Sequence, residues 1–70
     1  MDDQEFIEHQ YSLLATYRRN LRIILEQAAQ HGGEALAPLE LANQLHIQRT
    51  CIAQVKATLR DLGVIVDEYR

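Results

Sequence analysis

The residues of this chain that could do chemistry are three histidines and one cysteine, the usual side chains for metal binding and nucleophilic catalysis. They are His9, His31, His46 and Cys51. None of them falls into an HExxH, CxxC or HxxxH spacing. His46 and Cys51 lie five residues apart, so on a continuous helix their side chains point in different directions. We therefore expect no metal site and no cofactor.

Other catalytic arrangements are also missing from the sequence. It contains no Gly-rich phosphate loop followed by Lys and Ser or Thr, and no nucleophile elbow. A thiolate at Cys51 activated by a histidine would need a water-shielded cleft, which two packed helices do not provide. The sequence therefore predicts a protein that is not an enzyme and that takes no small-molecule substrate.

The chain has 70 residues, enough for one small domain spanning 1–70. A domain of this size buries only about 60% of the surface that its unfolded chain exposes, so its stability is marginal. Small chains gain stability from disulfides, metals or partner subunits. With a single cysteine and no metal motif, this chain is expected to gain it by association.

Charge and hydropathy narrow the list of partners. The net charge is −3, whereas free-standing nucleic-acid binders are more often basic. A single cysteine, no recognisable signal peptide and no apolar run near 20 residues fit a cytoplasmic protein without a membrane partner. A band of basic side chains is expected to be a solvated face, and the alternative is that the band binds an anionic partner. The band consists of Arg18, Arg19, Arg22, Arg49, Lys56 and Arg60.

A first long helix is predicted from Asp3 to His31. Asp2 can cap its free N–H groups, and Glu5, three residues later, completes a capping box. No glycine or proline interrupts the chain before Gly32, which ends the helix together with Gly33. A seven-residue repeat forms the seam along which this helix would pack. The seam consists of Ile7, Gln10, Leu14, Tyr17, Leu21, Ile24 and Ala28.

A second helix is predicted from Pro38 to Leu62. The short connection before it returns the helix antiparallel to the first, and Pro38 fits the first helical position. Gly63 ends the helix, and the short apolar run from Val64 to Val66 forms an extended tail. The seam of this helix has a single polar member, Gln48. Its apolar members are Leu41, Leu45, Ile52, Val55, Leu59 and Leu62.

A different interpretation breaks the second helix near His46. The segment would then resemble a winged-helix type of helix-turn-helix, with Val64 to Val66 as a vestigial wing. The residues that would contact DNA are Gln48, Arg49, Thr50 and Gln54. No glycine or proline lies between Leu45 and Ile52, so we favour the unbroken helix and an all-α antiparallel hairpin.

Apolar residues beside the first seam indicate an interface. Phe6, Leu13 and Leu25 are predicted to lie together on one flank, and such a stripe usually marks a contact surface. Two hairpins around a two-fold axis would bury the stripe as a dimeric four-helix bundle. Alternatively, the stripe packs within the chain on the segment around Val64 and Val66. The residues predicted to form the interface are Phe6, Leu13, Tyr17, Leu25, Val64 and Val66.

Four segments carry a resemblance to a known family. The run from Tyr17 to Gly32 is an Arg-rich Leu repeat ending in Gln, Ala and Gly, and Pro38 opens the second helix. The segment from Ile52 to Arg60 reads Ile-x-x-Val-Lys-x-x-Leu-Arg, and Gly63 to Asp67 reads Gly-Val-x-Val-Asp. From about Tyr11 onward the chain resembles the effector-associated, or adaptor-like, domains of large bacterial signalling proteins.

The resemblance implies a non-catalytic module fused to NACHT-type or other STAND ATPases, TIR or caspase-like effectors. Such modules join like to like in conflict or programmed-death signalling, in the manner of death-fold adaptors. The chain departs from the family pattern at Cys51 and in the run from His46 to Gln48. We expect a cytoplasmic homotypic interaction module whose partner is a second copy or a like domain.

Overall fold

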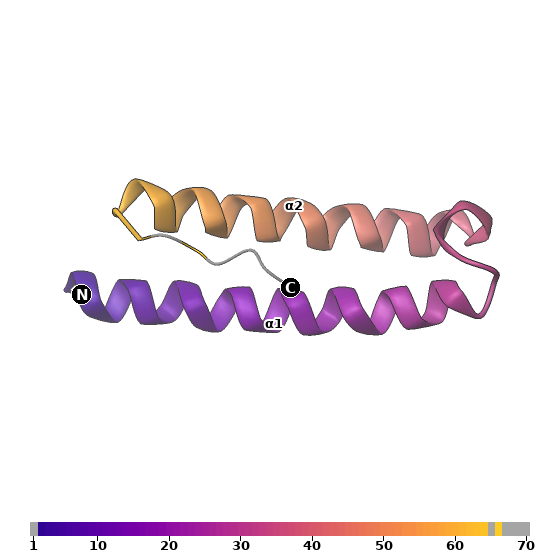
Figure 1. Ribbon diagram of the computed structural model, residues 1–70, viewed down its shortest axis with the longest axis horizontal. Coiled ribbons are helices and arrows are strands. Elements are labelled where there is room, and N and C mark those ends of the chain that lie inside the picture. The colour runs from indigo at the N-terminus through magenta and orange to yellow at the C-terminus, as the bar shows by residue number, and fades with distance from the viewer. Residues whose placement is uncertain (1, 65, 67–70) are drawn as a thin grey trace.

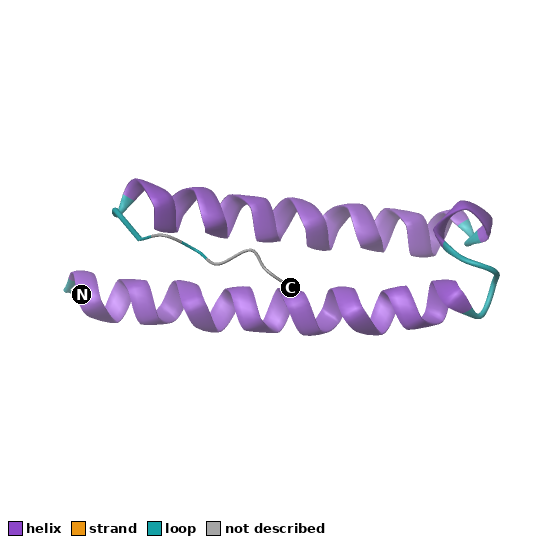
Figure 2. Ribbon diagram, viewed as in Figure 1, coloured by secondary structure: helices purple, strands orange, loops and turns teal. Residues whose placement is uncertain are grey.

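The computed structural model describes residues 2–64 and 66, and this part of the chain is all-helical. Two long helices, α1 (Asp3–Ala29) and α2 (Leu39–Asp61), lie side by side and antiparallel (Figure 1). A short 3-10 helix, η1 (Glu34–Leu36), lies between them in sequence. In Figure 2 the described residues are all drawn as helix or loop. The predicted antiparallel hairpin is confirmed for the described part of the chain.

The hairpin measures 44 × 22 × 15 Å, so it is one helix thick in its shortest direction. Neither helix, over the residues described, combines the length and the apolar character that crossing a membrane requires. Ile65 and residues 67–70, which include the middle of the predicted tail and the end of the closing Gly-Val-x-Val-Asp motif, lie outside the described residues.

Helix α1 begins as the sequence predicts and ends two residues earlier. The Asp2 carboxylate accepts a 2.8 Å hydrogen bond from the Glu5 backbone N–H, which satisfies one of the free donors of the first turn. The helix ends at Ala29, whereas we predicted His31. The backbone N–H of Gly33 reaches back 3.0 Å to the Ala28 carbonyl, and this bond closes the helix.

The turn between the helices depends on glycine. Gly32 and Gly33 have φ angles of 98° and 115°, a region that residues with a Cβ rarely adopt. A Cβ at Gly32 would also lie 2.8 Å from Leu36 Cδ1. Pro38 has an extended ψ of 155° and precedes the first helical residue, Leu39. Proline therefore occupies the cap position of α2, one residue before the position we predicted.

Helix α2 runs through His46 without a break. Its end matches the predicted glycine-terminated form: Gly63 has a φ of 82°, and the N–H of Val64 donates 2.9 Å to the Leu59 carbonyl. Val64 packs against the core cluster that contains Leu59. The bend that a helix-turn-helix requires at His46 is not formed.

The apolar core differs between the two ends of the hairpin. At the end where α1 begins and α2 ends, which we call the open end, Leu14, Ile52, Val55 and Leu59 form one buried cluster. Toward the opposite end, which we call the turn end, Ile24, Ala28 and Leu45 are buried. A polar seam residue is buried as well: the side chain of Gln10 is 8% exposed.

Candidate interaction surface

Most of the predicted interface residues pack within the single chain. Leu13, Tyr17, Val64 and Val66 are half-buried and lie against the open-end cluster. Of the predicted apolar stripe, Leu13 packs against the same cluster as Val64 and Val66. Phe6 and Leu25, the other two predicted interface residues, are also half-buried.

The predicted stripe of Phe6, Leu13 and Leu25 does not form one flank. A helix turns by about 100° per residue, so Leu25, twelve residues after Leu13, is rotated by about 120° from it. Phe6 and Leu13 differ by only about 20°. The seven-residue repeat placed the seam correctly, but Leu25 lies on the other side of that seam. This part of the prediction is wrong.

The four residues of the DNA-binding interpretation do not share a face of α2. Gln48 is half-buried, and its side chain lies toward α1, whereas Arg49, Thr50 and Gln54 are exposed. At about 100° per residue, Thr50 is rotated by about 200° from Gln48. A recognition helix presents its reading residues on one face, which these four residues do not provide.

Arg49 has a partner at the turn. Its Nη1 and Nη2 atoms donate to the two carboxylate oxygens of Glu34 at 2.8 and 2.9 Å. This paired geometry holds η1 against α2. The hydrogen bond from Arg49 holds the pKa of the Glu34 carboxyl below its usual value of 4.5. The same bond raises the pKa of Arg49. Both side chains are about half exposed, so water screens the pair.

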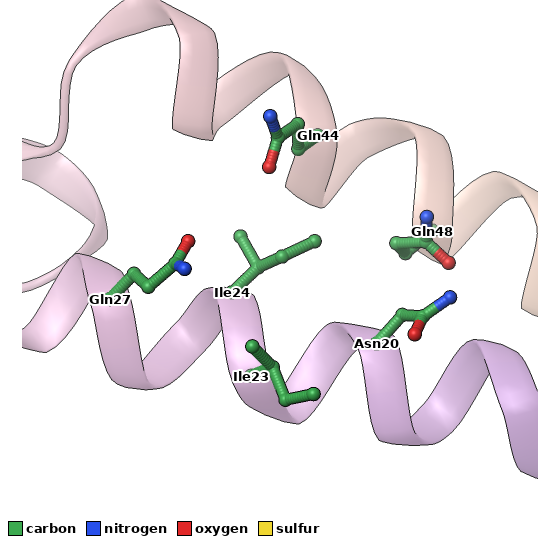
Figure 3. A pocket seen from close by; sticks show the side chains of 6 residues that line it. All are labelled: Asn20, Ile23, Ile24, Gln27, Gln44 and Gln48. Atoms are coloured by element: carbon green, nitrogen blue, oxygen red, sulfur yellow. The ribbon is translucent and has the colours of Figure 1, made fainter.

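A groove lies between the helices toward the turn end, and side-chain amides dominate its lining (Figure 3). Its volume is about 250 Å³, below the range of roughly 300–1,000 Å³ typical of small-molecule sites. The lining residues are Asn20, Ile23, Ile24, Gln27, Gln44 and Gln48. The groove is therefore smaller than a typical small-molecule site.

The Oε1 atom of Gln48 is buried and accepts no hydrogen bond from the described residues. Figure 3 shows the Asn20 and Gln48 side chains pointing toward one another across the groove. Buried polar atoms nearly always have a partner, because an unpaired acceptor loses its hydration without compensation. Gln48 is thus the one seam position where the packing of a single hairpin leaves a polar atom unsatisfied among the described residues.

Two isoleucines near this groove remain exposed, and the predicted set of interface residues does not include them. The side chain of Ile23 is 45% exposed, and that of Ile47 is 54% exposed. Their positions outside both seams were the available signal in the sequence. Other large apolar side chains are exposed elsewhere on the hairpin, namely Tyr11, Leu36, Leu39 and Leu62.

The hairpin has two broad faces of different chemistry. We call the face onto which the groove opens the amide face. The side chains around the groove are uncharged between Leu13 and Gln27 on α1 and between Gln44 and Thr58 on α2, and Arg19 lies at the edge of this face, one turn before Ile23. The opposite face, the basic face, holds most of the cationic side chains of the helices. These are Arg18, Arg22, Arg49, Lys56 and Arg60.

The residues capable of chemistry stay apart. The described part of the chain contains no cluster of three or more His, Cys, Asp or Glu side chains suited to a metal ion. His9, His31 and His46 are exposed, and the Cys51 thiol is free and half-buried. Comparison of the chain with protein-family models, curated proteins and solved structures found no match.

Proposed function

We propose that this chain is a non-catalytic interaction module that associates with a second copy of itself or with a like domain. The thinness of the hairpin carries the proposal: a slab of 44 × 22 × 15 Å gives each helix only one neighbouring helix. Side chains that point away from the α1–α2 contact therefore stay exposed, and they include Ile23 and Ile47. A second hairpin stacked on this slab would complete a four-helix bundle.

The resemblance to effector-associated domains supports the same function, with a larger cytoplasmic signalling protein as the context. Marginal stability supports it too, because one α1–α2 contact is a small core for a free-standing domain. Association of folded hairpins adds stability by mass action. The partner in this proposal is another folded hairpin of the same kind.

The proposal is tested by sedimentation equilibrium of the purified chain from about 5 to about 500 µM, a range that covers micromolar self-association. We expect the mass to rise from the 8.1 kDa monomer to twice that value within this range. A chain that stays monomeric throughout, with full helical circular dichroism, would contradict self-association.

A further inference from the structure

The two broad faces of the hairpin differ in whether they can meet a copy of themselves. A two-fold dimer brings the same surface of both copies together, so a surface whose charges have mostly one sign faces charges of that same sign. The basic face would oppose cationic side chains to cationic side chains, and like charges across an interface are unfavourable. On the amide face, by contrast, the side chains that α1 and α2 place around the groove are uncharged, and Arg19 lies at the edge.

Amide side chains are self-complementary. Each Asn or Gln has two N–H donors and a carbonyl acceptor, so amides from two identical surfaces can pair with one another. Asn20, Gln27, Gln44 and Gln48 supply four such groups around one groove. A surface of this composition can lose water against its own copy without leaving a charge unpaired.

The unpaired Gln48 Oε1 is a second, independent observation. This buried atom lacks a donor among the described residues. Gln48 lines the groove, so a rotation of its side chain would bring the covered Oε1 atom to an amide N–H₂ group of a second copy. A polar group at one seam position of a helical bundle also sets the register and orientation of the association.

We propose that a second copy of this chain docks on the amide face, with Ile23 and Ile47 as apolar contacts and amide pairing at Gln48. This inference rests on the proposed function and names the surface that performs it. The broad face, 44 × 22 Å, offers about 970 Å² in projection. A standard interface uses about 800 Å² per partner, so a dimer of standard size would cover most of this face.

Variants that introduce a charge at positions of similar exposure test the surface. Ile23→Glu places a charge on the amide face, and Tyr11→Glu places one on the opposite flank of the same helix. The two side chains are 45% and 44% exposed, and a rotation of about 120° separates them. Ile47→Glu and Ala53→Glu form a second pair on α2, where both residues are exposed and a rotation of about 120° again separates them.

We expect sedimentation equilibrium to show that Ile23→Glu and Ile47→Glu each weaken the dimer at least about tenfold, and Tyr11→Glu and Ala53→Glu less than about threefold. Circular dichroism establishes that each variant keeps its helices. If an amide-face variant unfolds, NMR of the wild-type side-chain NH₂ groups on dilution gives the same information. The groove amides should then shift, while Gln4, an exposed amide in the first turn of α1, stays fixed.

The outcomes separate the two proposals. A wild-type chain that is monomeric at every concentration contradicts self-association and, with it, the docking of a second copy on the amide face. A wild-type dimer that Tyr11→Glu or Ala53→Glu disrupts as strongly as the amide-face variants leaves self-association standing and overturns the choice of face. Loss of association only in Ile23→Glu and Ile47→Glu supports docking on the amide face.

Discussion

The open end and the turn end of the hairpin solve the same packing problem differently. At the open end Leu14, Ile52, Val55 and Leu59 form a buried cluster, and Val64 and Val66 cover it from the same chain. Toward the turn end Ile24 and Leu45 are buried, and a groove opens between the helices over the described residues. A two-helix hairpin therefore needs a third element to complete its core, and this chain supplies one at the open end.

The difference suggests a division of roles along the molecule. The open end is expected to hold most of the stability of the single chain. The turn end is expected to gain stability when another hairpin covers the amide face. Three changes, taken from the largest expected effect to the smallest, test this division.

Truncation of a core leucine should cost more at the open end. Leu59 is 0% exposed and belongs to the buried cluster, so Leu59→Ala should lower the free energy of unfolding by about 4 kcal/mol. Leu45→Ala, at the turn end, should lower it by about 2–3 kcal/mol, because side chains beside an open groove can relax into the cavity. Urea titrations of dilute protein followed by circular dichroism measure both. Equal losses, or a larger loss at Leu45, would contradict the division.

Removal of the unpaired amide should have the opposite sign. Gln48→Leu replaces a buried acceptor that lacks a donor, and we expect the dilute monomer to gain about 1 kcal/mol of unfolding free energy. Gln44→Leu is the control, since Gln44 lines the same groove without a buried unpaired atom. Thermal unfolding at low concentration compares the two. A destabilised Gln48→Leu monomer would mean that the single chain already satisfies Gln48.

The smallest effect concerns the Glu34–Arg49 pair of the turn. Because the folded state lowers the pKa of Glu34, the pair stabilises the fold above the usual carboxyl pKa of 4.5. This contribution is lost as the pH falls through the lowered pKa of the folded state. Melting temperatures measured from pH 7 to about pH 3 should therefore fall slightly more for the wild type than for Glu34→Gln. A steeper fall in the variant would contradict the pairing.

The sequence predicts those features that local chemistry determines. Asp2 starts α1, Gly63 ends α2, and the absence of glycine and proline around His46 keeps α2 unbroken. The two helix ends near the turn differ from the prediction: α1 ends at Ala29 and α2 begins at Leu39. The backbone hydrogen bonds of the glycine turn decide where each helix stops and starts. Such bonds depend on the path of the whole connection.

The candidate surface was less predictable. A seven-residue repeat identifies the seam, but it does not say which flank of one helix meets which flank of the other. Leu25 was therefore placed on the wrong flank, and the groove formed by Asn20, Gln27 and Gln44 was missed. Gln48, the single polar member of its seam, was the visible signal, and its meaning depends on what lies across from it in the folded hairpin.

The most direct test of the account is the dissociation constant of the wild-type dimer, measured at about 50 and about 500 mM salt, where charge screening differs strongly. Docking through the uncharged amide face predicts a dimer whose affinity changes less than about threefold, because few charges meet at the interface. A chain that is monomeric at both salt concentrations contradicts docking on the amide face. A dimer that tightens about tenfold in high salt also contradicts it, because screening of like charges would strengthen a dimer formed by two basic faces.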